Sequence, residues 1–236
     1  MATFYTPKLV TDGLVLCLDA GNTKSYPGTG TTWTDLTRGG NTGTLSGPTF
    51  SSANRGYFTC NGTSNYVLAN NTSLNSKFSS TSVSHFIWFY PTSAGQIVSE
   101  LGQTTINANW HDSNIEISTG GAVSFGTWAN IFPYTNKVTS SNLSFNTWYY
   151  MGFSYNGTTL TAYINGSPIG TTNFTRQAPY NNGHQTHYAL CATDSTNMGT
   201  GGYAGGRIGS FVVYNRALAA TEVLQNFNAI RGRYDI

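Results

Sequence analysis

The feature that most constrains the fold is the alternation of short strand-like runs with closely spaced turn residues. Residues 148–164, WYYMGFSYNGTTLTAYI, show it most clearly, because two runs of alternating side chains flank Asn156-Gly157. Asn-Gly tolerates a positive φ at both central positions, so we predict a type I′ hairpin turn with one apolar and one polar face. Similar runs recur along the chain, which is typical of an all-β sandwich or barrel.

Other strands are predicted wherever apolar or alternating runs stand between turn signals. These runs cover residues 13–19, 56–60, 66–68, 83–90, 96–101, 115–118, 122–125 and 207–215. Residues 109–112 fall between two runs and are predicted to form a loop.

Near the C-terminal end the spacing of apolar residues changes to the period of a helix. Residues 221–231 therefore predict one short helix beginning at Thr221 and ending before Gly232. Its apolar face is predicted to contain Val223, Leu224, Phe227 and Ile230.

The composition indicates a folded domain with an unusually uncharged surface. Aromatic residues make up 14% of the 236 residues, which argues against disorder. Only 8% of residues are charged, against about 25% in ordinary soluble proteins. Such a surface suits neutral partners such as sugars, or packing into an assembly. No linker divides the chain, so we expect one domain over residues 1–236.

Several classes of partner and location are disfavoured. The net charge is +2 without any basic run, so neither nucleic acid nor an anionic membrane is expected as a partner. No run approaches the ~18–20 apolar residues of a membrane span. Residues 1–10 lack the apolar core of a signal peptide, which predicts synthesis in a cytoplasm.

Cysteine and histidine residues give no metal-site pattern. Cys17, Cys60 and Cys191 are odd in number and lack a CxxC pair, so we predict buried free thiols. His184 and His187 form a short HxxH in a polar segment, where solvated side chains are expected. No metal ligands are therefore assigned.

Four segments carry a family resemblance. Residues 35–45 look like "DLSGNGNNGTL" and residues 57–67 like "FDGTNDYV". Residues 146–166 look like "NTWYHVAGTYDGTTLKLYVNG" and residues 206–218 like "GRIDEVRIYNRALS". In this order they resemble the laminin G-like branch of the concanavalin A-like lectin/glucanase family. The resemblance implies a jelly-roll sandwich of two antiparallel sheets, one of them concave, with rim loops that often bind glycans or proteins.

Many members of that family also carry calcium, and this sequence departs from them there. Asn61 and Asn65 stand where the family often has Asp, and Gly209-Ser210 replaces an acidic pair. Calcium prefers several anionic oxygens. No cofactor is therefore expected.

The acidic residues do not predict catalysis. Glucanases on this fold need two carboxylates about the glycosidic bond, and a strand typically presents them at alternate positions. None of the nine acidic residues lies at that spacing from another, and the nearest match, Glu116, stands alone. Carboxylates distant in sequence can still meet in the fold. We predict that the chain is not an enzyme.

Three segments combine the aromatic and polar groups that sugar binding needs. Each aromatic residue could instead clamp its own loop onto the sandwich. The candidate glycan-binding residues are Trp110, His111 and Asp112, then Trp128 and Tyr134, and finally Tyr180, Asn182 and His184.

The ends of the chain resemble tailed-phage virion proteins, in "GLVLCLDAGNTKSYPGTGTTWTDL" and "NAIRGRYDI". We therefore hypothesise a non-catalytic virion surface protein, either a head decoration or a tail-associated subunit. Its partners would be other virion subunits, copies of itself or a host surface polysaccharide. The alternatives are a free-standing carbohydrate-binding lectin module and a divergent glycoside hydrolase.

Overall fold

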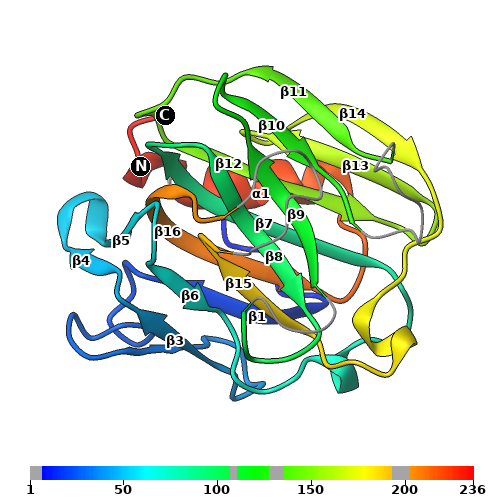
Figure 1. The fold of residues 1–236 in the computed structure, drawn as a ribbon, viewed down its shortest axis with the longest axis horizontal. Helices are drawn as coiled ribbons and strands as arrows, with labels where there is room; N and C mark the ends of the chain where they lie inside the picture. Colours follow the sequence, from blue (N-terminus) through cyan, green and yellow to red (C-terminus); the bar gives the residue numbers. More distant parts are fainter. Residues whose placement is uncertain (1–6, 107–110, 128–135, 193–201) are drawn as a thin grey trace, which may run out of the picture.

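Two antiparallel sheets lie face to face, and one helix packs on the outside of one of them (Figure 1). The computed structural model describes residues 7–106, 111–127, 136–192 and 202–236. The predicted all-β sandwich with a short C-terminal helix is confirmed. No helix of the described residues is long and apolar enough to span a membrane.

Sheet A is the sheet that carries the helix. Its strands are, in spatial order, β14 (Ser167–Asn173), β13 (Thr159–Ile164), β12 (Tyr149–Tyr155), β7 (Val83–Pro91), β16 (Gly205–Tyr214), β5 (Tyr57–Asn61) and β4 (Thr49–Ser51), with β1 (Leu14–Asp19) also paired to β16.

Sheet B faces it. Its strands are, in spatial order, β11 (Val138–Asn142), β10 (Ala122–Phe125), β9 (His111–Ile117), β8 (Gly95–Leu101), β15 (His187–Leu190), β6 (Tyr66–Leu68), β3 (Thr42–Ser46) and β2 (Thr32–Thr34). Short 3₁₀ turns join some of the elements, namely η1 (Ala53–Arg55), η2 (Asn75–Lys77), η3 (Pro179–Asn182) and η4 (Arg231–Arg233).

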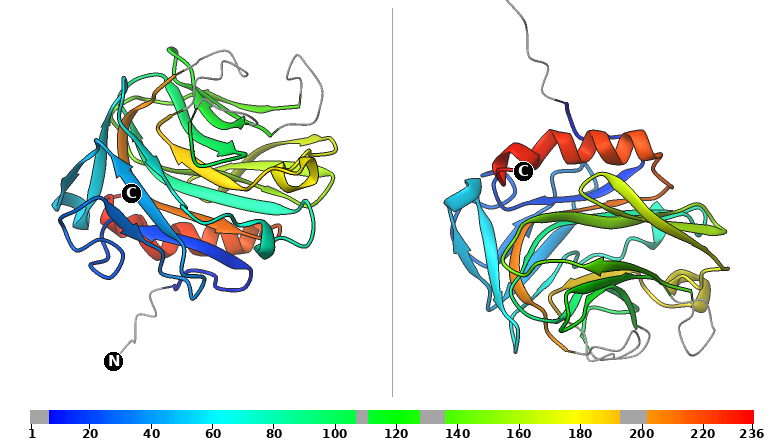
Figure 2. Two further views of the ribbon diagram at one scale, coloured as in Figure 1. Left: turned by 60° about the horizontal axis from the view of Figure 1, so that its bottom comes forward. Right: turned by 90° about the horizontal axis from the view of Figure 1, so that it is seen from above.

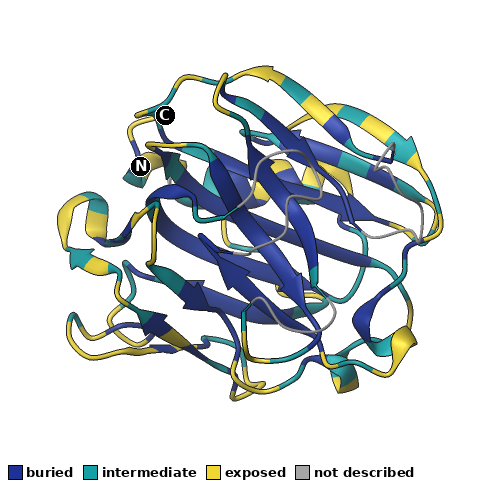
Figure 3. Ribbon diagram, in the orientation of Figure 1, coloured by how far each residue is buried: buried dark blue, intermediate teal, exposed yellow. Residues whose placement is uncertain are grey.

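The main core lies between the sheets (Figure 3). Successive side chains of a strand point to opposite faces. Ile87 and Phe89 of β7 therefore point into the core between the sheets, while Trp88 points outward. From sheet B, Ile115 and Ile117 meet them in the same apolar cluster. Cys17, Cys60 and Cys191 are buried free thiols, as predicted.

A second core lies on the other face of sheet A, beneath helix α1 (Ala220–Ile230). Trp88 and Tyr150 point outward from sheet A into this layer, and Phe227 of the helix stacks on Trp88 with 5.7 Å between ring centroids. The alternation predicted for the hairpin at 148–164 is confirmed, with Met151 and Phe153 in the main core, but the second face is buried as well, because Tyr150 packs against Phe227 of the helix. The middle strands of sheet A are therefore buried on both faces.

The helix itself differs in two respects from its sequence prediction. Leu224 is 45% exposed, whereas Asn226 is fully buried and bonds the Val10 N–H (2.8 Å) and the Tyr214 hydroxyl (3.0 Å). The helix begins one residue earlier, because the Glu222 carboxylate accepts the N–H of Ala219 at 2.8 Å.

The type I′ turn occurs one hairpin later than predicted. Asn165 and Gly166 have φ values of 51° and 79° and join β13 to β14 directly. Asn156 is absent from the residues with positive φ; its side-chain oxygen instead accepts the N–H groups of Thr158 and Thr159. The amide thus stabilises a three-residue loop by an Asx-type contact.

We predict that Phe227→Ala lowers the free energy of unfolding by roughly 3–5 kcal/mol, because it opens a cavity in the second core. Leu224→Ala on the same helix is the matched control and should cost under about 1 kcal/mol. Urea denaturation followed by tryptophan fluorescence measures both. Equal losses for the two variants would contradict the packing of α1 described above.

Candidate functional site

The outer face of sheet B lies on the opposite side of the molecule from α1 (Figure 2). Its β3–β6 region is hollowed to about 450 Å³. We call this the sheet B hollow; the residues that define it are Thr44, Ser46, Tyr66, Leu68, Asn71 and Thr104.

The pairing of β3 with β6 explains why these side chains face outward. Leu45 and Val67 are cross-strand partners and both belong to the core between the sheets. Because strand side chains alternate, the residues on either side of them point away from the core. The two strands therefore bury aliphatic residues on one face and present Tyr66 with its hydroxyl-bearing neighbours on the other.

The hollow combines an aromatic ring with uncharged hydrogen-bonding groups. Tyr66 is half-buried, and Leu68 adds an apolar floor. At the rim, the exposed Asn71 donates to the Thr44 hydroxyl at 2.8 Å. The lining of the hollow includes no Asp, Glu, Lys or Arg side chain. Such a surface can cover a sugar's apolar face and bond its hydroxyls without desolvating a charge.

The predicted glycan-binding residues occupy different environments. Trp110, Trp128 and Tyr134 lie outside the described residues. His111 and Asp112 belong to strand β9 and not to a loop, because the ladder of β8 extends to them. His111 is half-buried, whereas Asp112 is fully buried.

The η3 segment holds the remaining predicted residues. Tyr180 stacks on Phe78 with 6.0 Å between ring centroids, and its hydroxyl donates to the carbonyl of Ser80. The ring therefore clamps its own loop, which is the alternative that the sequence left open. Asn182 is exposed and His184 is half-buried.

His111, one of the predicted glycan-binding residues, lies at one end of sheet B, where the start of β9 is close to the start of β15. Leu101 is the cross-strand partner of both His111 and His187, which places the starts of β9 and β15 at one end of the sheet. The His184 carbonyl accepts a bond from Asn75 at 2.8 Å, so the η3 segment packs against the chain that follows β6. Asn71, in the same stretch after β6, lines the sheet B hollow.

Sequence reasoning missed the sheet B hollow. The alternation of Thr44, Leu45 and Ser46 is visible in the sequence, but nothing in it pairs this run with Tyr66. Only the β3–β6 ladder does so.

The ring of His187, in the HxxH pair, contacts other groups of the protein through both of its nitrogens. Both ring nitrogens of His187 have protein partners, the Asn70 carbonyl at 2.8 Å and the Gln185 side-chain oxygen at 2.9 Å. Burial lowers the pKa of His187. Within the described ranges, no three His, Cys, Asp or Glu side chains gather as a metal site requires.

The positions at which the resemblance implies calcium ligands have other contacts here. The side-chain oxygen of Asn61 accepts the backbone N–H groups of Thr63, Ser64 and Asn65, each at 3.0 Å. Gly209 lies within β16, where an added Cβ would stand 1.9 Å from the Tyr234 hydroxyl. Both positions therefore serve the fold.

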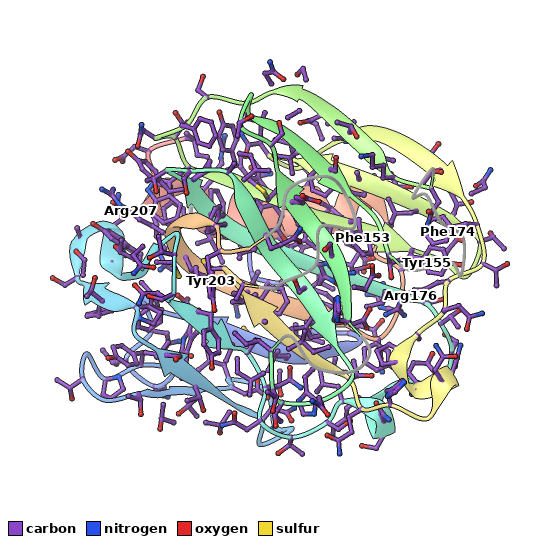
Figure 4. The ribbon with its side chains drawn as sticks, viewed as in Figure 1. Phe153, Tyr155, Phe174, Arg176, Tyr203 and Arg207 are labelled. Carbon is purple, nitrogen blue, oxygen red and sulfur yellow. The ribbon has the colours of Figure 1, made fainter. Side chains whose placement is uncertain are left out.

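Two carboxylates that are distant in sequence meet between the sheets. Glu100 and Asp112 are cross-strand partners, and each is at most 1% exposed. The guanidinium of Arg176 forms an ion pair with Glu100 and also donates to Thr127 and to the Thr81 carbonyl. Figure 4 shows Arg176 beside Tyr155, whose hydroxyl accepts the backbone N–H of Arg176 at 3.0 Å. Both carboxylates are thus interior, and Arg176 compensates the charge of Glu100.

Electrostatics around this pair follow from its burial. Burial alone would lower the pKa of Arg176, but the adjacent Glu100 carboxylate raises it overall, so the arginine stays charged. Burial, followed by the charge of Arg176, lowers the pKa of the neighbouring His85 to about 3. The His85 ring lies 4.3 Å from Phe153, centroid to centroid, and neither ring nitrogen has a hydrogen-bond partner in the described structure.

Two packed antiparallel sheets with a polar, hollowed outer face define a lectin-type jelly-roll sandwich. A family model described as the concanavalin A-like lectin/glucanases superfamily matches residues 61–224. The chain belongs to this family. Among curated proteins, none matches the chain.

Solved structures show the same fold at low sequence identity. A Trypanosoma rangeli sialidase in complex with the inhibitor DANA matches with a TM-score of 0.65 and 12% identity, over 93% of this chain and 33% of the sialidase. The chain thus spans about a third of that enzyme.

Two further similar structures are a domain of an arabinanase and the binding domain of a toxin, each in complex with a ligand. Domain 4 of AbnA, an arabinanase from Geobacillus stearothermophilus in complex with arabinotriose, has a TM-score of 0.60 and 14% identity, over 90% of this chain and 97% of that domain. The binding domain of botulinum neurotoxin DC in complex with SialylT has a TM-score of 0.63 and 14% identity, covering 93% and 52% of the two chains.

We predict that Arg176→Met lowers the free energy of unfolding by roughly 3–5 kcal/mol, because Glu100 is left buried without its counter-charge. The double variant Arg176→Met with Glu100→Gln should recover much of that loss. Chemical denaturation of both proteins checks this. A double variant no more stable than the single one would contradict a charge-based role for the pair.

We predict a pH dependence of stability that arises from His85. The folded protein resists protonating His85 until about pH 3, whereas the unfolded chain takes up that proton near its usual pKa of 6.5. The contribution of neutral His85 is therefore fully present above pH 6.5 and is lost as the pH falls from 6.5 towards 3.

His85→Phe should flatten the dependence of melting temperature on pH in this window, because it removes the group whose pKa differs between the folded and unfolded protein. Thermal denaturation at several pH values measures the slope. An unaltered slope in His85→Phe would refute the assignment to His85.

Proposed function

We propose that this chain is a non-catalytic glycan-binding protein, folded as one domain over residues 1–236, which binds neutral saccharides in the sheet B hollow. The observation that carries the proposal is the chemistry of that hollow, where Tyr66 lies beside hydroxyl and amide groups with no charged side chain in the lining. The similar domains described with arabinotriose and SialylT support carbohydrate as the class of ligand.

The arrangement of carboxylates supports binding without hydrolysis. A glycosidase places two carboxyl groups about 5–10 Å apart around a bound glycosidic bond. Glu100 and Asp112 are neighbours, but they lie between the sheets, and Arg176 compensates the charge of Glu100. A divergent glycoside hydrolase is the competing proposal, and release of reducing sugar from a bound polysaccharide would favour it.

We predict that Tyr66→Ala and Asn71→Ala each weaken glycan binding by about tenfold, which corresponds to about 1.4 kcal/mol. Tyr66→Ala removes the stacking surface, and Asn71→Ala removes hydrogen-bonding groups at the rim. A polysaccharide array identifies the ligand, and isothermal titration calorimetry measures its affinity.

Asn173→Ala is the matched control, because this exposed asparagine also bonds a threonine hydroxyl across a strand pair (Thr159, 2.7 Å) but lies on β14 of sheet A. The Asn173→Ala variant should bind the glycan with the affinity of the unaltered chain. Absence of binding across the array, or full affinity in both hollow variants, would overturn the proposal.

The biological setting that we propose is the surface of a virus particle, as a head decoration or tail-associated subunit. The resemblance of the chain ends to tailed-phage virion proteins and the 8% content of charged residues support it. On a particle, many copies would multiply weak contacts with host polysaccharide or with neighbouring subunits.

Mass spectrometry of purified particles tests this setting independently of glycan binding. The virion proposal expects the chain in stoichiometric amounts after density-gradient purification. Its absence from intact particles would refute the virion setting and leave a free-standing lectin module.

A further inference from the structure

We infer that the structure contains a second binding site, for the acidic group of a hydroxylated ligand such as a uronic acid, in a hollow at the C-terminal end of α1. This arginine hollow has a volume of about 640 Å³, within the roughly 300–1,000 Å³ of small-ligand pockets. The residues that define it are Asp19, Asn22, Thr23, Arg55, Asn228 and Arg233.

The arginine hollow is separate from the sheet B hollow. Its walls come from the end of β1, the η1 turn, the end of α1 and η4, all on the sheet A side of the sandwich (Figure 2). The inference therefore goes beyond the proposed function, and neither depends on the other.

One arginine is fixed in place by the fold. Arg233 forms an ion pair with Asp19 (Nη1 to Oδ1, 2.7 Å), and the same carboxylate oxygen accepts the Gly21 N–H at 2.8 Å. A Cβ at Gly21 would stand 2.2 Å from the Arg233 guanidinium and 2.7 Å from the Arg55 carbonyl oxygen, and because the second contact is to backbone, the close approach requires glycine. The Nε atom of Arg233 is buried and has no hydrogen-bond partner within the described structure.

The second arginine is presented by an unusual backbone. Asn54 and Arg55 have φ values of 49° and 63°, so two consecutive residues other than glycine adopt the left-handed conformation. This conformation costs free energy in such residues, and it is concentrated at functional positions. The turn is held by the Asn54 side chain, which donates to the Arg233 carbonyl at 3.0 Å. Arg55 is exposed and lines the hollow.

The charges of the arginine hollow favour an anion. Asp19 is engaged by Arg233, which leaves the charge of Arg55 uncompensated among the lining residues. A guanidinium binds carboxylate or phosphate oxygens in a bidentate manner. Around it, Asn22, Thr23 and Asn228 supply amide and hydroxyl groups for the ligand's own hydroxyls. An acidic sugar satisfies both requirements.

The test uses NMR titration of the whole chain with D-glucuronate, with D-glucose as the neutral probe and inorganic phosphate as a competitor. We expect saturable shifts with glucuronate, none of comparable affinity with glucose, displacement by phosphate and weakening at high salt. Arg55→Ala should weaken glucuronate binding by at least about fivefold. Arg55→Lys, which keeps the charge but loses the planar fork, should be intermediate.

Arg38→Ala is the matched control, because Arg38 is exposed and lies outside the hollow. The Arg38→Ala variant should bind glucuronate like the unaltered chain. Asn71→Ala should do so too, and this second control distinguishes the arginine hollow from the sheet B hollow. The inference is overturned if glucuronate does not bind up to about 50 mM. Equal binding of glucose, or unchanged affinity in Arg55→Ala, would also overturn it.

Discussion

Burial of both faces of the middle strands of sheet A is the physical constraint on which the rest of the structure depends. Inward residues such as Phe153 fill the space between the sheets, and outward residues such as Trp88 pack beneath α1. Sheet A is therefore the central layer, and the hydrophobic effect of two cores stabilises it. Sheet B, on the far side, is the sheet whose outer face carries the uncharged hollow of Tyr66 and Asn71.

The interior also contains a polar network that a sandwich core does not require. Arg176 brings its charge between the sheets to meet Glu100, and His85 stays neutral beside them. Burying an ion pair costs desolvation, so its contribution to stability is weak unless each group is hydrogen-bonded. Here Thr127 and the Thr81 carbonyl accept the remaining guanidinium bonds. Glu100 thus has a structural partner in Arg176.

Much of the fold could be predicted because alternation and turn chemistry are local properties. The strand at 66–68 and the helix near 221–231 were visible in the sequence for that reason. Features that depend on pairing between distant parts of the chain could not be predicted from the sequence. The sequence predicts a loop at Asp112 because its strand is recognisable only beside Glu100, and the predicted apolar helix face omits Asn226, which is buried and bonds Tyr214. The sheet B hollow likewise needs β3 and β6 to be adjacent.

Mapping of a bound saccharide onto the chain tests the central claim most directly. In a titration of isotopically labelled protein with an array-positive neutral oligosaccharide, the largest amide shifts should fall on the strands that carry Thr44 and Tyr66 and on Asn71. The oligosaccharide should be recovered intact. Shifts confined to the sheet A side, or a cleaved oligosaccharide, would contradict the assignment of sheet B as a non-catalytic binding face.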